Sequence, residues 1–160
     1  MKKKILTLLV AVLLCLTAFV GCDKNETTDT AFGISANGKS FSLGDSVDTL
    51  VGAMGEPLSV AEAGSCVGQG TLKEYTYNSM TVHVLENDKG ATVDYVSLTN
   101  DLVTTSKGIR IGSTKADVVE AYGEPNNDNG TNIQYVSGEF AIKFGIANDK
   151  VNAITLIRTT

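Results

Sequence analysis

The chain has 160 residues, and its thirteen lysines and arginines against eighteen aspartates and glutamates give a formal net charge of −5 at pH 7. This negative charge excludes a protein that binds nucleic acid or anionic lipid headgroups through electrostatic attraction. A single histidine in the whole sequence argues against a catalytic zinc site built from protein ligands alone. Hydrophobic residues make up 42% of the chain, enough for a buried core.

The N-terminus has the order of an export signal, because Lys2–Lys4 precede an uncharged run from Ile5 to Cys22. The run ends in Phe19-Val20-Gly21-Cys22, which resembles the lipobox of bacterial lipoproteins, with phenylalanine where leucine is usual. The resemblance implies that residues 1–21 are a lipoprotein signal peptide and that Cys22 is lipidated. The alternative is an uncleaved membrane helix, since eighteen uncharged residues reach the lower limit for spanning a bilayer. Both interpretations place the lysines inside and the globular part outside.

Residues 22–30 are predicted to be a flexible tether, because no apolar side chain follows Cys22 up to Thr30. Loss of the leader removes three lysines, so ten positive groups face eighteen negative ones and the mature net charge becomes −8. We therefore expect a lipid-anchored protein on the extracytoplasmic face of the cell membrane, which contacts the membrane through its N-terminal lipid only and binds no nucleic acid.

The remainder contains an internal repeat. Leu43-Gly44 is followed by Gly55-Glu56-Pro57, and Ile111-Gly112 is followed by Gly123-Glu124-Pro125. The proline stands thirteen positions after the first glycine in both copies. Internal repeats of this kind indicate repeated structural units. We predict repeat 1 over residues 31–100 and repeat 2 over residues 101–160, sharing one core within a single compact domain over 31–160.

A short amphipathic helix is predicted in each copy. In the first copy Val47, Leu50, Val51 and Met54 stand at i, i+3, i+4 and i+7; the second keeps Val118, Val119 and Tyr122. Asp45 or Ser46, and Ser113 or Thr114, are the candidate N-caps, with Asp48 or Asp117 placed to complete a capping box. The glycine and proline that follow predict the end of the helix, so Glu56 and Glu124 are expected in solvent.

Three antiparallel strands are predicted after each helix, from alternation and from β-branched and aromatic residues. Their predicted ranges are Leu72 to Tyr77, Met80 to Glu86 and Thr92 to Thr99, then Asn132 to Val136, Phe140 to Ile146 and Lys150 to Arg158. An additional hairpin is expected at the N-terminal edge, where Phe32 to Ala36 and Lys39 to Leu43 flank Asn37-Gly38. The expected fold class is α+β, with two tandem helix-plus-three-strand repeats that form a shared antiparallel sheet and pack short helices on one face.

The helix-cap phrase from Ile111 to Pro125, with strands after it, resembles the SmpA/OmlA lipoproteins of outer-membrane assembly. The tandem arrangement is similar to the β-lactamase inhibitory protein fold. That resemblance implies a concave sheet face, opposite the helices, that is offered to a protein partner. It carries over no inhibitory residue, because no functional motif of that family matches this chain.

The longest difference between the copies is a predicted loop from Leu58 to Glu74, eight residues longer than its counterpart. Because loops carry binding more often than regular elements do, this loop is the candidate partner-binding segment. Its candidate residues are Gly64, Ser65, Cys66, Val67 and Gly68. Cys66 has no partner for a disulfide within the mature chain, since Cys15 leaves with the leader and Cys22 is the lipidation site.

We find no sequence pattern for a hydrolase triad or a phosphate-binding loop, and expect no cofactor, metal or catalytic residue. His83 is expected on the strand face opposite Met80, Val82 and Val84. The segment Asn126–Gly130 fails the calcium-loop pattern and is expected to be a turn. The expected function is a non-enzymatic protein-binding module of unknown partner. The alternatives are an envelope-assembly lipoprotein of the SmpA/OmlA type, and a thiol-dependent enzyme or redox protein that uses Cys66.

Overall fold

Residues 32–64 and 70–159 are described by the structure, a computed structural model, and 52% of them lie in strands against 13% in helices. The predicted fold class is therefore wrong: the protein is mainly β, with an eight-stranded antiparallel sheet, a three-stranded sheet and two short helices. The prediction of helix-plus-three-strand repeats failed because it did not include the short strands at the sheet edges. The segments Ser59–Glu62 and Asn127–Asp128 expose all their side chains, so they carry no apolar alternation, yet each pairs with a neighbouring strand.

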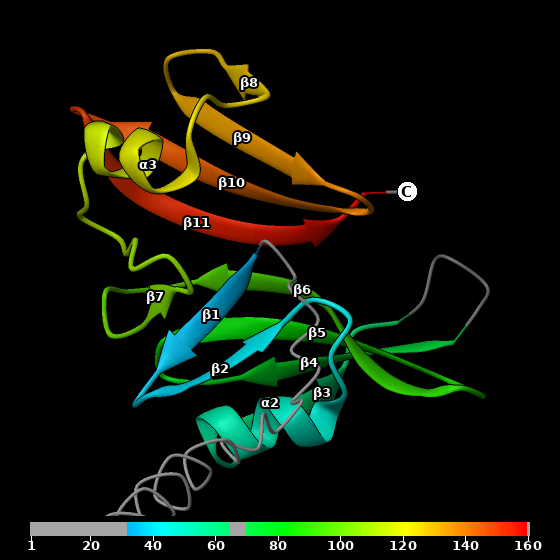
Figure 1. The fold of residues 1–160 in the computed structure, drawn as a ribbon. Coiled ribbons are helices and arrows are strands. Elements are labelled where there is room, and N and C mark those ends of the chain that lie inside the picture. Colours follow the sequence, from blue (N-terminus) through cyan, green and yellow to red (C-terminus); the bar gives the residue numbers. More distant parts are fainter. Residues whose placement is uncertain (1–31, 65–69, 160) are drawn as a thin grey trace, which may run out of the picture.

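The large sheet has the strand order β3-β4-β5-β6-β11-β10-β9-β8, so the last strand of each half meets at the centre (Figure 1). Thr155 pairs with Ser97 and Ile157 with Tyr95 where β11 joins β6. The six longer strands lie within two residues of their predicted bounds. The eight strands are β3 (Ser59–Glu62), β4 (Thr71–Thr76), β5 (Met80–Asn87), β6 (Gly90–Leu98), β8 (Asn127–Asp128), β9 (Asn132–Ser137), β10 (Phe140–Ala147) and β11 (Lys150–Arg158).

The small sheet has the order β2-β1-β7 and is built from β1 (Gly33–Ala36), β2 (Lys39–Ser42) and β7 (Thr104–Thr105). Its β1–β2 hairpin confirms the prediction from Asn37-Gly38. Strand β7 was not predicted, because two residues carry no periodicity and their pairing with Ile34 and Ser35 is long-range. Figure 1 shows β1 and β2 in front of the β4–β6 strands, and α3 in front of β10 and β11.

The core lies between the large sheet and the elements on this one side of it. Leu50 and Val118 of the helices and Ile34 and Phe41 of the small sheet are fully or almost fully buried there. The large sheet contributes alternate side chains from its central strands, which are Met80, Val82, Val84, Val93, Val96, Ile142, Phe144, Ile154 and Leu156. Burial of each aliphatic side chain contributes about 1.5–3 kcal/mol, which holds helices too short to be stable alone.

The helices α2 (Val47–Met54) and α3 (Lys115–Tyr122) have the predicted positions. Ser46 and Thr114 are the N-caps, and only α3 has a full capping box, in which Asp117 accepts from the Thr114 N–H at 2.8 Å. Asp48 does not complete a box in α2, because Thr49 occupies the third helical position and Ser46 accepts from its N–H. Each helix ends at a glycine, Gly55 or Gly123, with φ near +80° and an extended ψ.

The first glycine of each repeated phrase attaches the chain to a central strand. The Gly44 N–H donates to the Val93 carbonyl at 2.8 Å, and the Gly112 N–H donates to the Val151 carbonyl at 2.7 Å. In return Val93 and Val151 donate to the carbonyls of the residues after these glycines. The φ angles of +85° and +95° explain why glycine stands at both positions. The repeated phrase thus specifies a docking geometry as well as a helix end.

A tyrosine accompanies the end of each helix. Tyr77 donates its hydroxyl hydrogen to the Gly55 carbonyl at 3.3 Å, and Tyr135 donates to the Gly123 carbonyl at 3.0 Å. These bonds make Tyr77 the counterpart of Tyr135 in the other repeat. Glu56 and Glu124 are exposed, as predicted.

We expect Thr114→Ala to lower the free energy of unfolding by about 1 kcal/mol, because it removes the oxygen that caps α3. Hydrogen bonds from Thr114 also lower the pKa of Asp117, so this carboxylate's contribution is present above its unfolded pKa and is lost as pH falls through the folded value. Urea unfolding at pH 7 and at acidic pH measures both effects. Ser137→Ala, at an exposed strand end, is the control and should change little. An unchanged urea midpoint for Thr114→Ala would show that the Thr114 cap does not stabilise this helix.

Candidate functional site

The side of the large sheet opposite the core is the candidate site, and we call it the open face. Among residues 32–64 and 70–159, the helices and the small sheet pack on the other side only. Because successive side chains of a strand point to opposite faces, the neighbours of the buried Val82, Val96 and Leu156 lie on the open face. The strand registers align these neighbours into two rows that run across the sheet.

The first of these, the polar row, contains one residue from each of the eight strands. It consists of Ser59, Thr76, Thr81, Ser97, Thr155, Lys143, Gln134 and Asn127, each paired in register with the next. Neighbouring strands lie about 4.8 Å apart, so the row offers closely spaced hydrogen-bonding groups along its length. The side chain of every member can both donate and accept hydrogen bonds, except that of Lys143, which only donates.

The second, the central row, is more apolar and contains the only histidine of the chain. It consists of Ala61, Glu74, His83, Tyr95, Ile157, Ala141 and Val136. The His83 and Tyr95 rings stack with centroids 4.7 Å apart, and His83 Nε2 lies 3.3 Å from Glu74 Oε2. These two contacts restrict both rings, so Tyr95 and His83 form an ordered aromatic platform near the middle of the sheet. The prediction that His83 lies opposite Met80, Val82 and Val84 is confirmed.

An ion-pair network lies at the end of β11, on the side of the large sheet that carries the core. Arg158 donates to Asp94 at 2.9 Å and to Glu139 at 2.7 Å, and its guanidinium carbon lies 5.0 Å from the Phe140 ring centroid. Burial alone would lower the pKa of Arg158, but the hydrogen bonds to the two carboxylates outweigh it and raise the pKa. Arg158 is therefore charged and held by these contacts, and with Phe140 it lies near Gly44 on the core side of the sheet, not on the open face.

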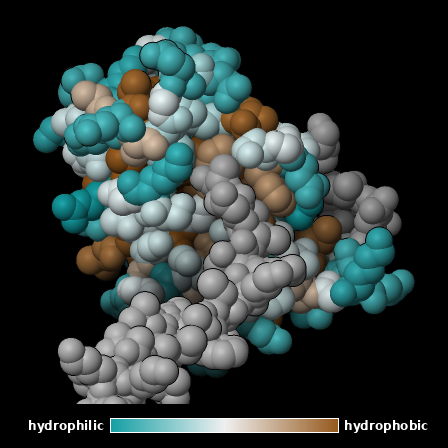
Figure 2. All heavy atoms as spheres, viewed as in Figure 1, coloured by the Kyte–Doolittle hydropathy of each residue, from teal (hydrophilic) through white to brown (hydrophobic). Residues whose placement is uncertain are grey.

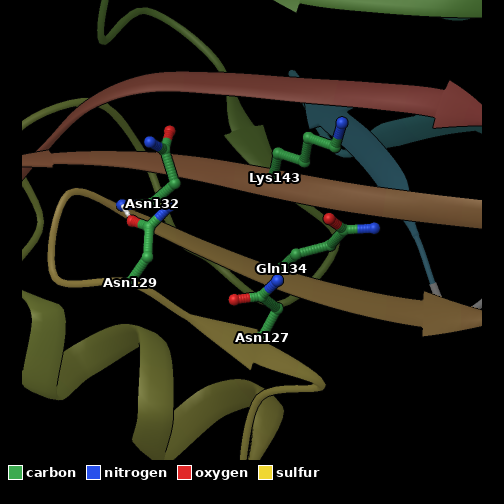
Figure 3. Close-up of a pocket in the computed structure, with 5 residues that line it drawn as sticks. All are labelled: Asn127, Asn129, Asn132, Gln134 and Lys143. Carbon is green, nitrogen blue, oxygen red and sulfur yellow. Dashed lines mark hydrogen bonds between the residues drawn. The ribbon is translucent and has the colours of Figure 1, made fainter.

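A shallow hollow of about 260 Å³ lies at the β8–β10 end of this face and is lined by Asn127, Asn129, Asn132, Gln134 and Lys143 (Figure 3). The Asn129 carboxamide oxygen is committed to the turn, where it accepts from the Asn132 N–H at 2.8 Å. Asn127, Gln134 and Lys143 have no side-chain hydrogen bond or ion pair to other residues that the structure describes. Their hydrogen-bond donors and acceptors are therefore available to a polar or hydrated surface of a ligand.

The predicted binding loop is only partly described. Ser65, Cys66, Val67 and Gly68 lie outside the described residues, as does Cys22, and Gly64 is exposed in the connection after β3. The predicted extent of the loop, Leu58 to Glu74, is wrong, because β3 and the first part of β4 fall inside it. These strands pair with each other, so the longer segment of the first copy extends a hairpin at the edge of the sheet.

Sequence reasoning missed the residues of the open face. The sequence signal for this face was the alternation of side chains along β5, which placed His83 on the face opposite the core. What was missing was the register between β6 and β11, which brings Tyr95 beside Ile157. No grouping of three or more metal-ligating side chains occurs in the described parts of the chain. The turn predicted over Asn126–Gly130 is correct only in part, because Asn127 and Asp128 form β8; the Asp128 and Asn129 side chains accept from the Gly130 and Thr131 N–H groups in the connection that follows.

Hydrophobic surface on the side that carries the small sheet occurs in separate patches (Figure 2). Among the residues that the structure describes, the exposed large apolar ones are Leu58, Val60, Leu102 and Val136. Within 32–64 and 70–159, neither helix has the length and apolar character needed to cross a membrane.

Comparison of the chain with protein-family models, with curated proteins and with solved structures finds no match.

Proposed function

We propose that this protein is a membrane-anchored extracytoplasmic lipoprotein that works as a non-enzymatic protein-binding module, and that the open face is its binding surface. The observation that carries the proposal is the ordered platform of Tyr95 and His83, beside Ile157, on a sheet whose other side holds the core. Tyrosine is enriched at the energetic centres of protein interfaces because it offers a large apolar ring with a polar end.

The surroundings of the platform also suit a protein partner. Interfaces combine an apolar centre with a polar rim, and here the polar row and the amide-lined hollow lie beside the central row. The platform is held by its own contacts before any partner arrives, so little side-chain freedom would be lost on binding. The leader and Cys22 support the anchor and the extracytoplasmic location.

Crosslinking and affinity capture of the full, membrane-anchored chain test the binding proposal. We expect a reproducible envelope or secreted partner whose recovery falls by at least about tenfold with Tyr95→Ala, since hot-spot truncations cost about 2 kcal/mol or more. Leu102→Ser is the matched control, because Leu102 is 72% exposed and lies outside the large sheet. Failure to capture any partner, or a partner insensitive to Tyr95→Ala, would contradict this function for the open face.

Cys22→Ser tests the anchor separately. The variant is expected to release the protein into the medium or to block processing of the leader. Unchanged membrane retention would instead support an uncleaved membrane helix.

A further inference from the structure

The two edges of the large sheet differ in how they are protected. The β8 edge has two residues, Asn127 and Asp128, and the Asp128 carboxylate is paired with Lys115 Nζ at 2.6 Å. The β3 edge has four residues, all exposed, and pairs with β4 on one side only. A short charged edge is a usual defence against pairing with another chain, whereas a longer apolar edge invites it.

Half of the backbone groups of β3 point away from the sheet. The Ala63 N–H donates to the Leu72 carbonyl across the β3–β4 pair at 2.8 Å. Alternate residues of an antiparallel strand direct their backbone groups to the same side, so Ser59 and Ala61 also face β4. The N–H and C=O groups of Val60 and Glu62 therefore point outward, where no other described strand is paired with β3.

Side chains at this edge favour one kind of occupant. Leu58 is 66% and Val60 is 49% exposed, which places two of the four large exposed apolar residues of the described chain here. Glu62 is exposed and has no ion-pair partner in the described segments. Its cross-strand neighbour Lys73 is bound to Glu86 at 2.5 Å. The edge thus presents apolar surface beside a carboxylate that forms no direct ion pair with the described residues, although its charge contributes to the raised pKa of Lys73.

We propose that β3 is a strand-addition site for an extended segment of a partner polypeptide that alternates apolar side chains with flanking basic ones. Backbone hydrogen bonds to Val60 and Glu62 give the strand register, the apolar residues cover Leu58 and Val60, and a lysine or arginine pairs with Glu62. A second copy of this chain fits less well, because self-pairing brings two acidic edges of an acidic protein together. The site consists of the outward backbone edge of β3 with the side chains of Leu58, Val60 and Glu62, whereas Ser59 and Ala61 of the same strand belong to the open face.

The test uses the full chain in detergent micelles and two capped heptapeptides, Lys-Thr-Val-Thr-Val-Thr-Lys and its analogue with glutamate at both ends. Amide exchange and amide chemical shifts are followed by NMR. With the basic peptide at saturation we expect exchange at Val60 and Glu62 to slow by at least about fivefold. The acidic peptide should bind about tenfold more weakly.

Two variants separate recognition from folding. Glu62→Lys should reverse the preference, so that the acidic peptide becomes the tighter ligand. Val60→Pro removes one outward N–H without removing a bond to β4 and should abolish protection at Glu62. Leu102→Ser is the control and should bind like the wild type. The proposal is overturned if millimolar basic peptide leaves Val60 and Glu62 unprotected, if Glu62→Lys does not change the preference, or if the shifts lie around Tyr95 instead.

Discussion

Replacing Phe144 by alanine should lower the free energy of unfolding by about 3–5 kcal/mol, the largest effect we expect from a single substitution in this protein. Phe144 lies in β10 with no exposed surface, and its ring centroid is 5.3 Å from that of Tyr122 and 6.2 Å from that of Tyr135. Alanine loses the transfer free energy of the ring and leaves a cavity that rigid neighbouring strands cannot fill.

Urea unfolding measures this change, with a shifted midpoint at constant slope as the expected result. Val136→Ala on the neighbouring strand is the matched control, because Val136 is 41% exposed on the open face and its loss should cost at most about 0.5 kcal/mol. If Phe144→Ala does not fold, Phe144→Leu supplies a smaller loss of about 1–2 kcal/mol. A change no larger than that of Val136→Ala would contradict the burial of this ring.

The same variant tests whether the two halves share one core. The buried cluster runs from Phe32 to Leu156 without a division, and β6 and β11 pair across the centre of the large sheet. Local probes of unfolding at Met80 and at Ile142 should therefore report the same shifted urea midpoint for Phe144→Ala. Two separate transitions, with only the Ile142 probe affected, would show that each half folds as its own unit.

Local signals in the sequence located the helices and the longer strands. The Thr114 cap, the four-residue stripe ending at Met54 and the alternation around Val82 are all set by neighbours a few positions away, so they could be read without a structure. Edge strands lack such signals. Strand β3 buries nothing, and its four residues adopt strand geometry because β4 offers hydrogen-bonding partners.

The candidate site shows the same limit. Alternation alone indicated that one sheet face would be free of core residues, and it placed His83 there. The join between β6 and β11 decides that Tyr95 and Ile157 are neighbours, although they are far apart in sequence. That join is a long-range pairing between the two halves of the chain, and no local pattern reveals it.

Tyr122→Phe should raise the free energy of unfolding at pH 7 by about 1–2 kcal/mol. The Tyr122 ring packs among Phe32, Tyr135 and Phe144, with Lys107 Nζ 4.7 Å from its centroid, but its buried hydroxyl has no hydrogen-bond partner among the described residues. A buried hydroxyl left unpaired loses its hydration without compensation, and phenylalanine keeps the ring while removing that cost. Thermal or urea unfolding at pH 7 measures the gain.

The same hydroxyl makes stability depend on alkaline pH. Burial raises the pKa of Tyr122 to about 12. The nearby Thr105 hydroxyl acts in the opposite direction and lowers this pKa, although it forms no hydrogen bond with Tyr122. Because the folded pKa exceeds the unfolded value near 10, this contribution is complete below pH 10 and is lost as pH rises toward 12. At pH 11 the wild type should have lost about 1 kcal/mol that Tyr122→Phe retains.

Tyr77→Phe is the matched control for both effects. Burial also raises the pKa of Tyr77 to about 12, but its hydroxyl donates to the Gly55 carbonyl at 3.3 Å. This variant should therefore reduce the alkaline loss without any gain at pH 7, since phenylalanine leaves that carbonyl without its donor. If Tyr122→Phe is instead less stable than the wild type at pH 7, the Tyr122 hydroxyl has a hydrogen-bond partner in solution, and its pKa is set by that partner in addition to burial.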